Sequence, residues 1–150
     1  MKKFLLVVFM VLIMAFFTTG ANAEYKFAEN WTWTDTAYQS VFLGLTYVDW
    51  KQTHWMASHN WQWDGGYYRE QNPFLGDFPD SGKVDKLIPL GMVLHTLVAM
   101  AIPPRSCTEE QEKNGRININ FRRIWQCLFI VVESAAVYNN YTLGVQFELP

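Results

Sequence analysis

The apolar residues of this 150-residue chain are gathered in long blocks and do not form regular stripes. Residues 87–102 contain no charged side chain, and residues 124–138 contain one acid, Glu133. Continuous apolar blocks are typical of helices that lie in a bilayer, whereas soluble helices show an apolar stripe with a period of 3.6 residues. The pattern therefore predicts membrane-embedded helices at about 85–102 and 121–143.

A third segment, residues 36–57, is apolar in its first half and polar in its second, where Asp49, Lys51, Gln52 and His54 occur. We expect a helix here, but one whose second half is costly to expose to lipid. The predicted fold class is therefore all-α: a small helical membrane protein with two or three membrane-embedded helices.

The N-terminus has the three zones of a signal peptide. Lys2 and Lys3 precede an apolar run over residues 4–17, and small residues lead to an A-x-A site that ends at Ala23. The run is short for a permanent span, which needs about 20 residues, so we expect cleavage before Glu24. An uncleaved anchor is the alternative. Residues 24–150 then form one domain. We expect this domain to lie in the inner membrane of a bacterium, and the protein to be encoded by the bacterium or by a phage.

Charge suggests a topology for the predicted helices. The segment between the last two helices is rich in basic residues, namely Arg105, Lys113, Arg116, Arg122 and Arg123. The positive-inside rule places such a segment in the cytoplasm. If the N-terminus is exported, a cytoplasmic basic segment favours two membrane spans. The helix at 36–57 then lies on the periplasmic side, and the N-terminal half faces the periplasm. A third span would put the basic segment outside.

Polar positions recur at helical spacing in each predicted helix. The sets are Asp49, Gln52 and Thr53 in the first helix, Gly91, His95 and Ala99 in the second, and Gln126, Glu133 and Asn140 in the third. Residues spaced by three, four or seven share one face of a helix, so each helix offers a polar strip to a common interior. We expect Glu133 to face protein, with His95 as its nearest partner by depth. These contacts are either a functional pocket or hydrogen bonds that hold the helices together.

The segment Glu70-Gln71-Asn72-Pro73 is the most unusual motif. Asn72 is restricted by Pro73 to extended conformations, so the motif presents Glu70 at a fixed bend. Together with D-x-x-Q-T at residues 49–53, His95 and Glu133, the motif resembles a family of small bacterial and phage-encoded membrane proteins that carry E-x-N-P. The resemblance covers about residues 38–144. It implies a helical membrane fold and no assigned activity.

Few functions are indicated. A net charge of −2 gives no electrostatic case for nucleic acid, and H-E-x-x-H, C-x-x-C, G-x-S-x-G and phosphate-loop motifs are missing from the sequence. We expect a non-enzymatic interaction or accessory role, with the bilayer and another membrane protein as partners of the aromatic segment 58–82. The cluster of Trp and Tyr residues from Trp61 to Tyr68 is expected to be exposed for this contact. The alternative is a membrane enzyme or metal-binding protein.

The candidate pocket for that alternative consists of Asp49, Gln52, Thr53, Glu70, Asn72, His95 and Glu133. Its carboxylates and imidazole are candidates for metal ligands, with His54 and His59 as further candidates, but no spacing among them is diagnostic. The sequence indicates no particular cofactor.

Overall fold

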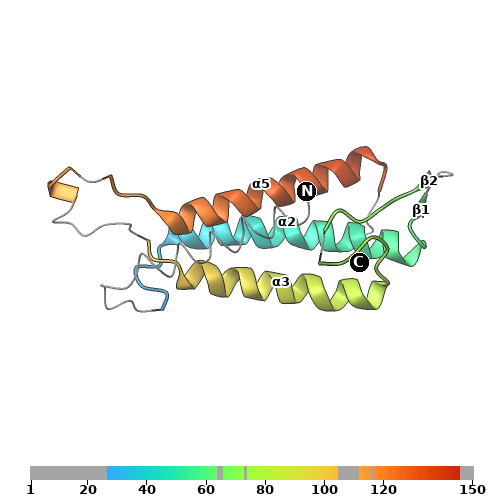
Figure 1. The fold of residues 1–150 in the computed structure, drawn as a ribbon, viewed down its shortest axis with the longest axis horizontal. Coiled ribbons are helices and arrows are strands. Elements are labelled where there is room, and N and C mark those ends of the chain that lie inside the picture. Colours follow the sequence, from blue (N-terminus) through green and yellow to red (C-terminus); the bar gives the residue numbers. More distant parts are fainter. Residues whose placement is uncertain (1–26, 64–65, 73, 105–111, 116, 146–150) are drawn as a thin grey trace.

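In the described part of the computed structural model, three long helices lie side by side (Figure 1). The structure describes residues 27–63, 66–72, 74–104, 112–115 and 117–145. The helices are α2 (Trp33–Ser58), α3 (Ser81–Ala101) and α5 (Phe121–Thr142). A two-residue hairpin between α2 and α3 pairs β1 (Gln62–Trp63) with β2 (Gly66–Tyr67). The predicted all-α fold is confirmed, and the predicted signal peptide, residues 1–23, lies outside the described residues.

Helix α2 lies between the other two and packs along both of them, whereas α3 and α5 touch only slightly (Figure 1). Helices α2 and α5 run in the same direction and α3 runs against them. The beginning of α2, the end of α3 and the beginning of α5 therefore share one end of the bundle, and the hairpin lies at the other end (Figure 1).

Side-chain caps decide where the helices begin. Thr32 and Asp35 form a capping box, so α2 begins three residues before the predicted position 36. The Asp80 carboxylate accepts a hydrogen bond from the Lys83 N–H at 2.9 Å, so α3 begins four residues before position 85. Asn120 caps α5, which begins at residue 121 as predicted.

Within the described part of the chain, the buried hydrophobic residues form three small clusters along the bundle and not one continuous core. Ala99, Ile102 and Trp125 form the cluster at the end where α3 stops. The other two clusters lie toward the hairpin and consist of Leu75, Val84 and Ile88, and of Met56, Trp61 and Val145. Much of the space between the helices is consequently filled by polar side chains.

The largest of these is Arg122, in the first turn of α5, which is 0% exposed. Its Nε donates to the carbonyl oxygens of Ala99 and Ile102, each at 3.1 Å, and Nη2 donates to the Glu29 carbonyl at 3.0 Å. Its Nη1 lies 3.6 Å from the Asp35 carboxylate. One guanidinium thus joins the ends of all three helices.

Only α3, among the helices of the described residues, is long and apolar enough to cross a membrane when length and composition alone are considered.

We predict that Arg122→Met strongly destabilises the bundle, because it leaves the buried Asp35 carboxylate without its counter-charge. Breaking one partner of a buried ion pair typically costs about 3–5 kcal/mol. The neighbouring Arg123 is exposed, so Arg123→Met should change stability by less than about 0.5 kcal/mol. Thermal unfolding followed by circular dichroism compares the two variants, and equal midpoints would contradict this role of Arg122.

Candidate functional site

A line of buried polar side chains follows the interior of the bundle from one end to the other. Nine polar or charged residues of the described part are buried: Asp35, Gln39, Thr46, Gln52, Thr53, His95, Arg122, Gln126 and Asn140. The heptad spacing of Gln126, Glu133 and Asn140 correctly predicted that the first and last of these face the interior. Buried polar groups need hydrogen-bond partners, so this line imposes specific contacts between the helices.

Three carboxylates lie near one another toward the hairpin end, and we call Asp49, Glu70 and Glu133 the carboxylate group. Asp49 interacts electrostatically with both of the others. Asn140 of α5 donates through Nδ2 to Asp49 Oδ1 at 3.0 Å and to Gln52 Oε1 at 3.3 Å. The structure therefore brings together three of the predicted acids and Gln52. Thr53, the next residue of the predicted strip, is 2% exposed.

His95 lies at a different level of the bundle. Its Nδ1 is 3.3 Å from Gln39 Nε2, and its ring stacks on Phe42 with centroids 3.7 Å apart. Phe42 precedes Asp49 by two helical turns, which corresponds to about 10 Å along α2. Glu133 Oε2 has no hydrogen-bond partner in the described part of the chain. The structure thus pairs His95 with Gln39, and not with Glu133 as the depth argument suggested.

The E-x-N-P segment forms a hydrogen-bonded turn. Glu70 Oε1 accepts from the Asn72 N–H at 2.7 Å, and Asn72 Oδ1 accepts from the Phe74 N–H at 3.0 Å. Glu70 N–H donates to the Asp77 carbonyl at 2.9 Å, which ties the turn to the following chain. Burial raises the pKa of the Glu70 carboxyl, while the N–H groups of Asn72 and Gln71 act to lower it. The bend holds Glu70 within electrostatic range of Asp49.

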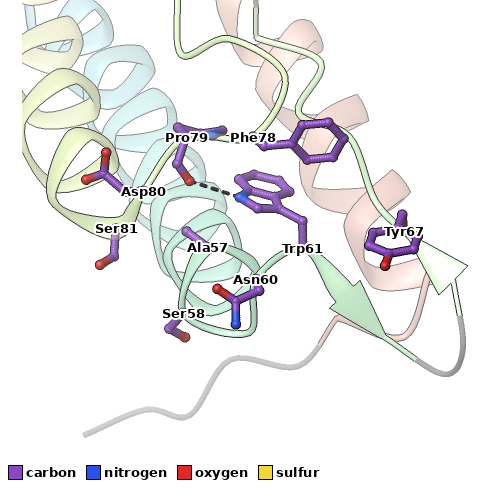
Figure 2. A pocket seen from close by; sticks show the side chains of 9 residues that line it. All are labelled: Ala57, Ser58, Asn60, Trp61, Tyr67, Phe78, Pro79, Asp80 and Ser81. Carbon is purple, nitrogen blue, oxygen red and sulfur yellow. Dashed lines mark hydrogen bonds between the residues drawn. The ribbon is translucent and has the colours of Figure 1, made fainter.

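The aromatic segment between α2 and α3 has a buried anchor and an exposed surface. Trp61 is 4% exposed and donates through Nε1 to the Pro79 carbonyl at 2.9 Å, so the expectation that it lies on the surface is wrong. Tyr67, Phe74 and Phe78 are exposed. Beside Trp61 lies an open hollow of about 730 Å³ (Figure 2). It is lined by Ala57, Ser58, Asn60, Trp61, Tyr67, Phe78, Pro79, Asp80 and Ser81.

Within the described residues, no group of three or more His, Cys, Asp or Glu side chains has the arrangement to hold a metal ion. The two surface histidines are engaged elsewhere. His54 Nδ1 lies 2.9 Å from Asp85 Oδ1, and His59 stacks on Trp55.

Sequence reasoning missed Asp35 and Gln39, and it treated Arg122 as a loop charge. Thr32-x-x-Asp35 is a capping-box pattern, which marks the start of a helix and would have placed Asp35 in its first turn. Gln39 follows Asp35 by four residues and so shares its face. Nothing in the sequence alone shows that this face meets Arg122, because that contact depends on how the helices pack.

Comparison of the chain with protein-family models, with curated proteins and with solved structures finds no match. The resemblance to the E-x-N-P proteins stays a prediction.

We predict that Asn140→Leu destabilises the protein by about 1–3 kcal/mol, because the buried oxygens of Asp49 and Gln52 lose their donor. Asn139 is the adjacent residue and is exposed. Asn139→Leu is therefore a matched control that introduces the same side chain outside the interior. Unfolding midpoints of the two variants test the contact, and a smaller loss for Asn140→Leu than for Asn139→Leu would refute it.

Proposed function

We propose that this chain is a small integral membrane protein, with a non-enzymatic interaction role at the membrane surface. The observation that carries the proposal is the distribution of polar and apolar residues, because polar side chains are buried in the bundle and apolar ones cover its surface. Among the residues that the structure describes, nine polar or charged residues and ten hydrophobic ones are buried, while many large hydrophobic side chains are exposed. Soluble proteins rarely bury charged groups to this extent, and they rarely expose extended apolar surfaces.

The exposed apolar residues form faces on two helices. On α3 they are Leu90, Val93, Leu94 and Leu97, and on α5 they are Ile124, Leu128, Val131 and Val132. Their spacing of three and four residues places each set on one side of its helix. Such faces are stable against lipid chains, whereas contact with water would be unfavourable.

The packing of α2 supports three spans. Helix α3 has 21 residues and α5 has 22, which gives lengths of about 31–33 Å, close to the thickness of the bilayer core. Helix α2 has 26 residues and packs along both of them. Asp35 in α2 and Arg122 in α5 lower the apolar character of these helices, but both are buried against protein. Charged residues of membrane helices typically face the interior in this way.

Two spans are favoured by an excess of basic residues on one side of the predicted helices. Arg122 is buried and paired with Asp35, and without it the numbers of basic residues on the two sides are nearly equal. Along the sequence, the remaining basic residues are Lys26 before α2 and Arg105, Lys113, Arg116 and Arg123 between or next to α3 and α5. The others are Lys51, Arg69, Lys83 and Lys86, from the second half of α2 to the beginning of α3. With an exported N-terminus, three spans place residues 103–120 outside and the hairpin end inside.

The loop at the hairpin end supports the interaction role. Hydrogen bonds from Trp61 to Pro79, from Lys83 to the Leu75 carbonyl and from Arg69 to Asp77 hold it in one shape. This framework presents the exposed rings of Tyr67 and Phe78 beside the hollow (Figure 2). Aromatic side chains that are fixed before binding lose little entropy when a partner binds, and they are enriched at interfaces.

Cysteine labelling tests the membrane arrangement. In bacterial cells that express the chain, Cys107 should react with a membrane-impermeant maleimide added from outside. Cys127 is exposed about a third of the way along α5 and should stay unlabelled because it faces lipid. The Cys107→Ser variant should therefore lose all labelling. Labelling of Cys107 only after lysis would support two spans, and release of the chain by alkaline carbonate would contradict membrane insertion.

Site-specific crosslinking tests the interaction role. A photo-crosslinking residue in place of Tyr67 should give a defined adduct with another membrane protein, because this ring is exposed beside the hollow. The same residue in place of Lys113, which is exposed at the opposite end, is the matched control. Equal adducts at both positions, or none at Tyr67, would count against the proposal.

A further inference from the structure

Four buried polar atoms at the level of His95 have no hydrogen-bond partner within the described residues. They are Asp35 Oδ1, Gln39 Oε1, His95 Nε2 and Gln126 Oε1. Their side chains are 0–5% exposed and come from all three helices. Unpaired buried polar atoms are unfavourable, so each requires a partner.

Hydrogen bonds place these four residues together. Gln126 Nε2 of α5 donates to the Asp35 backbone carbonyl of α2 at 3.0 Å. Gln39 lies one turn after Asp35 and contacts His95 of α3 through Nε2. The rings of Phe42, Trp125 and Phe129 surround the His95 ring, with centroids 3.7, 5.5 and 4.8 Å from its own. The four residues that carry the unpaired atoms are therefore neighbours in one region of the bundle interior, beside aromatic rings.

The hydrogen-bond network also fixes the proton on His95. Thr96 Oγ1 donates to the Met92 carbonyl at 2.8 Å, so its oxygen must accept from Gln39 Nε2, which lies at 2.8 Å. The same Gln39 amino group then donates its second hydrogen to His95 Nδ1. A neutral imidazole whose Nδ1 accepts carries its proton on Nε2. The four unpaired atoms are thus one N–H donor and three oxygen acceptors.

Charge excludes an ionic ligand here. The Asp35 carboxylate is already matched by the Arg122 guanidinium at 3.6 Å, and the two glutamines and the neutral histidine add no charge. A cation or an anion would therefore lack a counter-charge. A small neutral molecule that both donates and accepts hydrogen bonds fits the set.

We propose that the space between His95, Gln39, Gln126 and Asp35 is an internal hydration site, in which ordered water accepts from His95 Nε2–H and donates to the side-chain oxygens. Buried water typically bridges polar groups that the protein leaves unpaired, and it makes about three hydrogen bonds. This inference does not depend on the membrane proposal, because it uses only contacts inside the bundle.

NMR on the full chain in detergent solution tests the site, with ¹⁵N-labelled histidine and with His95→Phe to assign the resonances. We expect the ring proton of His95 on Nε2, and a rotating-frame Overhauser cross-peak from that proton to water. Gln126→Leu should weaken or abolish the cross-peak, because it removes one acceptor. The same substitution at Gln71, which is exposed, should leave it unchanged.

Two results would overturn the inference. One is a proton on Nδ1, and the other is a direct hydrogen bond from His95 Nε2–H to Gln126 Oε1 without a water cross-peak. If Gln126→Leu does not fold, the tautomer and the cross-peak of the unaltered protein still decide between these outcomes.

Discussion

The buried charge of Arg122 is the constraint on which the packing of the helices depends. A guanidinium never loses its proton in a protein, so at 0% exposure it must be surrounded by acceptors. It finds them in the last turn of α3, in the chain before α2 and in the Asp35 carboxylate. Because each of these comes from a different segment, satisfying one side chain fixes the level at which the three helices meet.

From that fixed end, the interior divides into two polar regions. His95, Gln39 and Gln126 occupy the first, next to Arg122, and the carboxylate group with Asn140 occupies the second. Phe42 and Phe129 contact each other edge to face between them, with centroids 6.1 Å apart. The aromatic pair lies between the neighbours of His95 on α3 and those of Glu133 on α5, so the two residues have separate surroundings.

The sequence was informative about elements and faces, and less so about contacts. Apolar blocks predicted the three helices, and the seven-residue spacing of Gln126 and Asn140 predicted their inward orientation. The starts of α2 and α3 were placed too late because hydrophobicity does not register the caps Thr32 and Asp80. The pairing of His95 depends on the relative level of α3 and α5, and the burial of Trp61 depends on the path of a loop. Neither is encoded in local periodicity.

Asp35 combines two duties in one carboxylate. Its Oδ2 accepts from the Thr32 N–H at 2.8 Å and the Thr32 hydroxyl at 2.7 Å, which closes the first turn of α2, and it also neutralises Arg122. The beginning of α2 and the packing of α5 consequently depend on the same atom, Asp35 Oδ2. Fraying at the beginning of α2 withdraws the counter-charge from a neighbouring helix, so this end of the bundle should order or melt cooperatively, as a single unit.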